Sequence, residues 1–176
     1  DGITSIGKYF FYNCDNVANV KLPNTLEFLG ESAFEGISSL KEIELPSSLT
    51  GMGVDVFKGT GLQKVIINGT VVGKEMFLGC NDLTEVELTE NCKTIKTEAF
   101  GDCSSLKKIT IPKSVTEIQE GAFSNTDLAD VYLYFNSVAD NYTGYPTGVT
   151  KHYLDNPHWN CGEQGNNIVA ELDINT

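Results

Sequence analysis

Histidine is scarce in this sequence, which contains two among its 176 residues, His152 and His158. Both lie near the C-terminal end, so a serine–histidine–acid triad elsewhere in the chain would have no general base. The sequence also lacks G-x-S-x-G, a Walker loop and H-E-x-x-H, the motifs typical of hydrolases, nucleotide-binding proteins and zinc proteases. We therefore expect neither catalysis nor a cofactor.

Basic residues are half as numerous as acidic residues, 12 against 24, and the formal net charge at pH 7 is −12. A chain with this balance repels phosphate backbones and anionic lipids, which argues against nucleic-acid binding and against docking on membranes. No stretch approaches the roughly 18 consecutive apolar residues of a membrane span, so we expect no direct membrane insertion.

The five cysteines form no C-x-x-C pair, the arrangement that many zinc and redox sites use. Cys14, Cys80 and Cys103 share one position of the repeat described below, and Ile37 fills that position in another unit. We expect free, buried thiols that behave as small hydrophobic residues. A Cys80–Cys103 disulfide is the alternative, because the two cysteines lie in adjacent units.

One segment near the C-terminus, HYLDNPHWNC, combines residue types that bind metals, namely His152, Asp155, His158 and Cys161. Their H-x5-H-x2-C spacing matches no established zinc motif. Ordinary residues of a terminal cap are therefore the preferred interpretation, and no metal site is predicted.

What the sequence does contain is a repeat, marked by phenylalanines at intervals of 23, 23, 20, 23 and 23 residues. Five or six residues after each phenylalanine begins the pattern L-x-x-I-x-L, whose alternating end predicts a short strand with one buried face. Proline follows three of these strands, where its missing N–H suits the exit from a sheet. The phenylalanines are Phe11, Phe34, Phe57, Phe77, Phe100 and Phe123.

One such unit cannot bury its own apolar side, whereas stacked units share a continuous core with the phenylalanines as its spine. The segment GESAFEG, which surrounds Phe34, is long enough for one helical turn and no more. Three positions after each strand stands a small polar residue that is suited to bonding the backbone where the coil turns. These residues are Thr25, Ser48, Thr70, Asn91, Ser114 and Asn136.

The two ends of the repeat predict a division into residues 1–133, a solenoid of six units, and residues 134–176, a C-terminal cap. Ile6 lies five residues before Phe11, as Leu29 does before Phe34, so the chain is expected to begin inside a unit, as an N-terminal truncation would. The tail loses the period, and its aromatic residues suit the covering of an open core. They are Tyr134, Tyr142, Tyr145, Tyr153 and Trp159.

The repeating unit I-G-x-x-A-F-x-x-C-x-x-L-x-x-I-x-L-P resembles the BspA-type leucine-rich repeat of bacterial surface proteins. Its clearest copies are LGESAFEGISSLKEIELP (29–46), IKTEAFGDCSSLKKITIP (95–112) and the degenerate IGKYFFYNCDNVANVKLP (6–23). The resemblance implies a right-handed leucine-rich-repeat solenoid with one short parallel strand and one short helical turn per 23-residue unit. It also implies an extracellular location at a bacterial surface, since members of this family are typically secreted or surface-attached and some act as adhesins.

The residues that flank the central aliphatic residue of each strand point away from the core and form two columns on one sheet face. In one interpretation they only stabilise the stack, because acidic and basic rows alternate down the columns. In the other they are a ligand-binding face, with Ile66 and Tyr132 as apolar exceptions. The candidate residues are Glu42, Glu44, Lys64, Ile66, Glu85, Glu87, Lys108, Thr110, Asp130 and Tyr132.

Together these observations predict a non-catalytic recognition module, monomeric and displayed at the cell surface or secreted. Its expected partner is a protein or a glycan, with host extracellular matrix as one candidate. The main alternative is a spacer whose repeats hold another domain away from the cell and bind nothing. An enzyme within the tail is a third, less favoured hypothesis.

Overall fold

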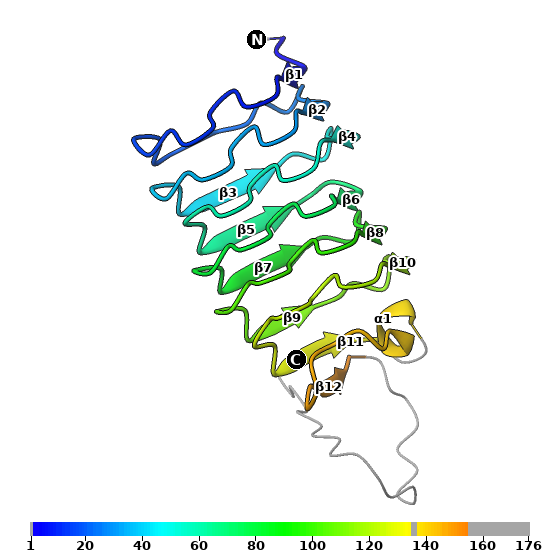
Figure 1. Ribbon diagram of the computed structural model, residues 1–176. Helices are drawn as coiled ribbons and strands as arrows, with labels where there is room; N and C mark the ends of the chain where they lie inside the picture. Colours follow the sequence, from blue (N-terminus) through cyan, green and yellow to red (C-terminus); the bar gives the residue numbers. More distant parts are fainter. Residues whose placement is uncertain (1, 135–136, 155–176) are drawn as a thin grey trace, which may run out of the picture.

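The computed structural model describes residues 2–134 and 137–154, and Figure 1 shows them as a single stack of coils. The chain winds through about seven turns with very little helix, so the predicted solenoid of short parallel strands is confirmed. Most coils contribute one strand to a main sheet, made of two three-stranded ladders, on one side of the stack. The strands of this sheet are β3 (Glu42–Leu45), β5 (Lys64–Ile67), β7 (Glu85–Leu88), β9 (Lys108–Thr110), β11 (Asp130–Leu133) and β12 (Thr150–Tyr153).

A second row of strands, each two residues long, lies beside the main sheet in Figure 1. Most coils therefore contain a second, shorter strand besides the predicted one. The sequence does not reveal this row because two residues are too few to show an alternating pattern. Its members are β1 (Ser5–Ile6), β2 (Phe28–Leu29), β4 (Gly51–Met52), β6 (Val71–Val72), β8 (Thr94–Ile95) and β10 (Glu117–Ile118).

The first predicted strand, around Val20 and Leu22, is not assigned as a strand in the structure. Leu22 is nevertheless buried, and Val20 packs against the core. The aliphatic pattern of this unit therefore correctly identifies inward-facing residues, although the backbone does not form a ladder with β3.

The phenylalanines form one column through the core, as the repeat predicts. Neighbouring rings are stacked at centroid distances of 5.1, 5.1, 5.6, 5.5 and 5.6 Å from Phe11 to Phe123. Five of the six side chains are completely buried, and Phe11 is half-buried in the first coil. The turns that carry them are hydrogen-bonded but do not extend into helices.

Small polar residues link successive coils, also as predicted. The Ser48 hydroxyl donates to the Leu26 carbonyl at 2.7 Å, and Ser114 donates to Cys92 at 2.8 Å. Thr25 and Asn91 make equivalent bonds at 2.8 and 3.2 Å. Thr70 makes no such bond, and Asn136 lies outside the described residues.

The C-terminal end of the stack is closed by the helix α1 (Val138–Asn141), by β12 and by two tyrosines. Tyr145 stacks on Phe123 with ring centroids 5.5 Å apart, and Tyr142 meets the same ring edge-on at 6.2 Å. Strand β12 pairs with β11 in parallel and so adds a strand to the main sheet. Trp159, which we also expect in the cap, lies outside the described residues.

Candidate ligand-binding face

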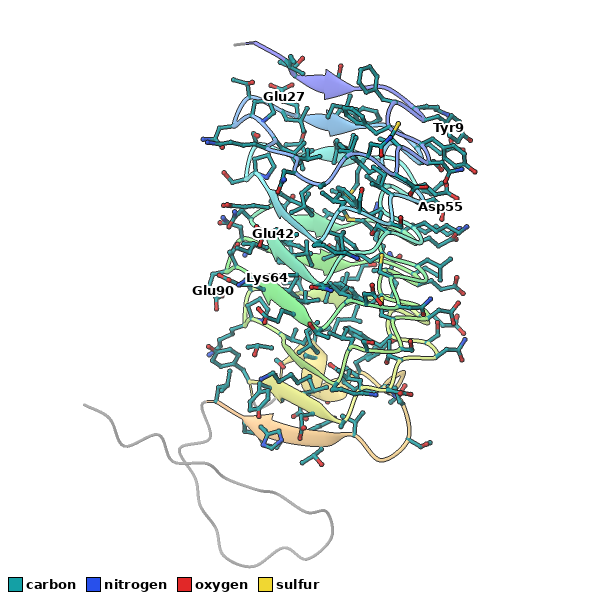
Figure 2. The ribbon with its side chains drawn as sticks, turned by 90° about the vertical axis from the view of Figure 1, so that its left-hand side faces the viewer. Tyr9, Glu27, Glu42, Asp55, Lys64 and Glu90 are labelled. Carbon is teal, nitrogen blue, oxygen red and sulfur yellow. The ribbon has the colours of Figure 1, made fainter. Side chains whose placement is uncertain are left out.

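The ten candidate residues lie on the outward side of the main sheet, in register within each of its two ladders, and we call them the exposed face. Glu42 pairs with Lys64 and Lys64 with Glu85 across β3, β5 and β7, while Glu44, Ile66 and Glu87 form the parallel column. In β9 and β11 the columns continue, with Lys108 paired with Asp130 and Thr110 with Tyr132. Figure 2 shows Glu42 and Lys64 on the side of the stack away from Tyr9 and Asp55.

The charges of the exposed face are only partly compensated by one another. Lys64 Nζ lies 3.3 Å from Glu85 Oε2, in a pair whose side chains are 46% and 64% exposed and which therefore contributes little to stability. The Asn68 amide donates to Glu44 at 2.9 Å. The side-chain carboxylates of Glu42 and Glu87 make no hydrogen bond or ion pair with any residue that the structure describes. These two carboxylates therefore remain available to a partner.

At its C-terminal end the exposed face includes a residue that the repeat did not predict. His152 of β12 lies opposite Tyr132, its ring stacks on the tyrosine ring at 4.5 Å, and its Nε2 is 2.7 Å from Asp130 Oδ1. The segment VTKHYL, residues 149–154, shows no regular alternation, so only its strand-favouring residues Val149, Thr150 and Tyr153 could have indicated this strand.

Two grooves cross the exposed face. One, of about 620 Å³, lies over β7 and β9 and includes Glu85, Glu87, Lys108 and Tyr132 in its wall. The other, of about 520 Å³, lies over the residues around β3 and includes Glu42, Glu44 and Ile66. Lys64 borders both. The apolar exceptions Ile66 and Tyr132 thus lie in hollows, where an apolar group gains most from contact with a ligand.

The cysteines in the described part of the chain are free. Cys80, Cys92 and Cys103 are buried in the core as expected, whereas Cys14 is only half-buried, because it lies in the first coil and no coil covers it on the N-terminal side (Figure 1). The Cys80 thiol donates to the Phe57 carbonyl at 3.1 Å, and Cys103 donates to Phe77 at 3.2 Å. Burial raises the pKa of Cys80 and of Cys92 to about 11, and it raises the pKa of Cys103 further. These thiols therefore remain protonated near neutral pH and are poor nucleophiles and poor metal ligands.

Of the four residues weighed for a metal site, only His152 belongs to the described part of the chain, where it contacts Asp130 and Tyr132. Asp155, His158 and Cys161 lie outside it. Residues 2–134 and 137–154 contain no group of three or more side chains able to hold a metal ion. Over the same residues, no helix has the length and apolar character needed to cross a membrane.

The stacked coils, the parallel strands and the buried aliphatic columns define a leucine-rich-repeat solenoid. Comparison with known families agrees, because the model of the BspA type leucine rich repeat region matches residues 4–132 in six copies. The chain belongs to this family. Among curated proteins, no relative matches it significantly.

Solved structures share the fold. A leucine-rich repeat protein from Bacteroides ovatus matches 88% of this chain with 25% identity and a TM-score of 0.55. One from Eubacterium ventriosum matches 84% with 23% identity and a TM-score of 0.53, and one from T. pallidum matches 74% with 27% identity and a TM-score of 0.50. The matched parts are 52%, 45% and 52% of those proteins, so the chain spans about half of their length.

Proposed function

We propose that the chain is a non-catalytic recognition module displayed at a bacterial cell surface or secreted, and that the exposed face of its main sheet binds a protein or a glycan. The observation that carries this proposal is the exposed face itself. It combines two unpaired carboxylates with two grooves that include Ile66 and Tyr132, a composition that internal stability does not require.

Membership of the BspA-type family supports the surface location, and the solenoid form supports recognition, because stacked repeats provide an extended and rigid face. A rigid face loses little conformational entropy on binding, which favours affinity. Adhesion to host matrix is the form of recognition that we consider first.

Charge reversal on the exposed face tests the proposal. The chain is screened against purified extracellular-matrix proteins and a glycan array, and each partner found is titrated against a variant in which Glu42, Glu44, Glu85 and Glu87 are replaced by lysine. A second quadruple variant is the matched control, since it changes the net charge equally, from −12 by +8 to −4, away from the exposed face. It carries lysine in place of Glu35, Glu98, Glu117 and Glu120, which lie in the turns that carry the phenylalanines and in β10.

We expect the first variant to lose about tenfold or more in affinity and the control variant to retain it within about twofold, because unfavourable charges at an interface cost several kcal/mol. Both variants must show the circular dichroism spectrum of the folded chain. Equal losses in the two variants would show that only net charge matters. Failure of every probe to bind would favour the spacer function instead.

A further inference from the structure

The main sheet is interrupted between β7 and β9, and we call this interruption the seam. Strands β3, β5 and β7 form one hydrogen-bonded ladder, and β9, β11 and β12 form another. Within the described residues, no backbone hydrogen bond connects residues 84–89 with residues 106–111. The seam lies near the middle of the exposed face, between the rows of Glu85 and Lys108 (Figure 1).

Polar backbone groups face one another across the seam. The N–H groups of Glu85 and Thr89 donate to β5, at 3.0 Å to Gln63 and 3.2 Å to Ile67. Alternate residues of a strand in a parallel sheet bond to opposite neighbours, so the N–H and C=O of Val86 are directed toward β9. By the same alternation, those of Lys108 are directed toward β7. Such groups are costly to leave unpaired unless they can reach solvent or a ligand.

The seam also exposes a residue that is buried in other coils. Val86 is half-buried, as is Val20 in the first coil at the open end of the stack, whereas the equivalents Ile43, Val65, Ile109 and Val131 are between 0% and 4% exposed. The groove of about 620 Å³ lies directly over it, with Val86 and Ile109 among its lining residues. The groove therefore has an apolar floor between two rows of unpaired backbone donors and acceptors.

The walls of this groove are polar but carry no net charge, unlike the chain as a whole. Lys64 and Lys108 balance Glu85 and Glu87, while Thr110 and Tyr132 contribute hydroxyl groups. A polyanion would be repelled by the net charge of −12, and a polycation would meet two lysines in the groove. Sugar hydroxyls, which both donate and accept, suit this mixture of donors and acceptors.

We propose that the groove over the seam binds a neutral oligosaccharide, with sugar hydroxyls bonding the Val86 and Lys108 backbone and one sugar ring packing on Tyr132. This inference rests on the proposed function of the exposed face and specifies its ligand class. Glu85 and Glu87 accept hydrogen bonds from further hydroxyls at the edge of the groove. Packing of an apolar sugar face on a tyrosine ring combines burial with hydrogen bonding in the manner usual for aromatic side chains.

Amide hydrogen exchange tests the seam without any ligand. We expect the Val86 amide to exchange at least about tenfold faster than that of Val65, which occupies the same position in the closed ladder of β3, β5 and β7. Similar exchange at Val65 and Val86 would show that β7 and β9 are paired in solution and would overturn the proposal.

Binding is tested on an array of neutral glucose-, mannose- and galactose-based oligosaccharides, with sulfated oligosaccharides and a lysine-rich peptide as competing probes. The best neutral probe is then titrated calorimetrically against Tyr132→Ala and Glu87→Gln, with Tyr12→Ala and Glu98→Gln, both in turns that carry the phenylalanines, as matched controls away from the groove. We expect a loss of about tenfold in the first pair and less than about twofold in the controls. The probe should also slow exchange at Val86.

The outcomes separate this inference from the proposed function. If only the sulfated probes or the lysine-rich peptide bind, or if neutral binding is unaffected by Tyr132→Ala and Glu87→Gln, the assignment of the groove is wrong. If a matrix protein binds and is lost on charge reversal of the exposed face while no neutral oligosaccharide binds, the recognition function stands and the ligand class proposed here fails.

Discussion

Asp55 shows how the local surroundings of one residue alter its ionisation. Its side chain is 19% exposed, its Oδ1 is buried without a hydrogen bond, and Lys58 Nζ lies 3.3 Å from that oxygen. Burial raises the pKa of Asp55 more than Lys58 lowers it, and the neighbouring Glu75 adds to the increase. The backbone here has a φ of 58°, in the left-handed region that asparagine also tolerates well.

Asp55→Asn is therefore predicted to stabilise the protein at neutral pH. Below the ordinary pKa of 3.8, Asp55 is protonated in both states and the variant should match the natural chain. As pH rises above 3.8, the Asp55 carboxyl group loses its proton in the unfolded state before it does so in the folded state. The natural chain therefore loses stability relative to the variant, and this loss is complete once the pH exceeds the raised pKa of the folded state. We expect the variant to be the more stable of the two at pH 7, as measured by urea unfolding. A variant less stable at pH 7 would mean that the Lys58 ion pair outweighs burial.

At the scale of the element, the phenylalanine column is the structure on which adjacent coils depend. Phe77 is completely buried and stacks between Phe57 at 5.6 Å and Phe100 at 5.5 Å. We predict that Phe77→Ala lowers the free energy of unfolding by about 3–5 kcal/mol, since it removes burial and leaves a cavity. Phe10→Ala, at a ring that is 65% exposed, should change it by less than about 0.5 kcal/mol. Similar small effects in both would refute a shared core.

Two Tyr-to-Phe substitutions in the C-terminal cap are predicted to change the free energy of unfolding in opposite directions. The buried hydroxyl of Tyr145 has no hydrogen-bond partner among the residues that the structure describes, and burial raises its pKa strongly. The hydroxyl of Tyr142 donates to the Gln119 carbonyl at 3.2 Å. Tyr145→Phe should therefore stabilise the chain by about 1 kcal/mol and Tyr142→Phe destabilise it by about 1 kcal/mol, as measured by denaturant unfolding. Destabilisation by Tyr145→Phe would show that its hydroxyl is satisfied in solution.

At the scale of the whole molecule, the net charge of −12 is distributed over a stack held together mainly by its apolar columns. The ion pairs within it are mostly between exposed side chains, such as Lys8–Glu31 at 2.8 Å, and contribute little. Self-repulsion of the like charges should therefore be the larger electrostatic effect.

We predict that raising NaCl from 20 to 500 mM increases the melting temperature by about 2–5 °C, because screening weakens the repulsion more than it weakens the ion pairs. The control variant with lysine at Glu35, Glu98, Glu117 and Glu120 should respond less, since its net charge is −4. A melting temperature that falls with salt would show that ion pairs dominate.

The sequence predicted the inward-facing residues well because each of them recurs. Six phenylalanines at a nearly constant interval share one environment, and the outward residues between the aliphatic positions follow from strand alternation. Strand β12 could not be predicted in this way, since residues 134–154 contain a single coil with no second copy to align. The contact of His152 with Tyr132 and Asp130 was therefore not foreseen.

The sequence by itself determined which side chains enter the core and which remain outside, because burial depends on a periodicity that each unit repeats. Only the tertiary structure decided where neighbouring coils pair and where they separate. Val86 is the same residue type as Val65 and Val131, yet only Val86 borders the seam. Whether the strands of two adjacent coils pair depends on the distance between those coils along the stack. That distance is set by the packing of many coils together and is encoded in no single residue.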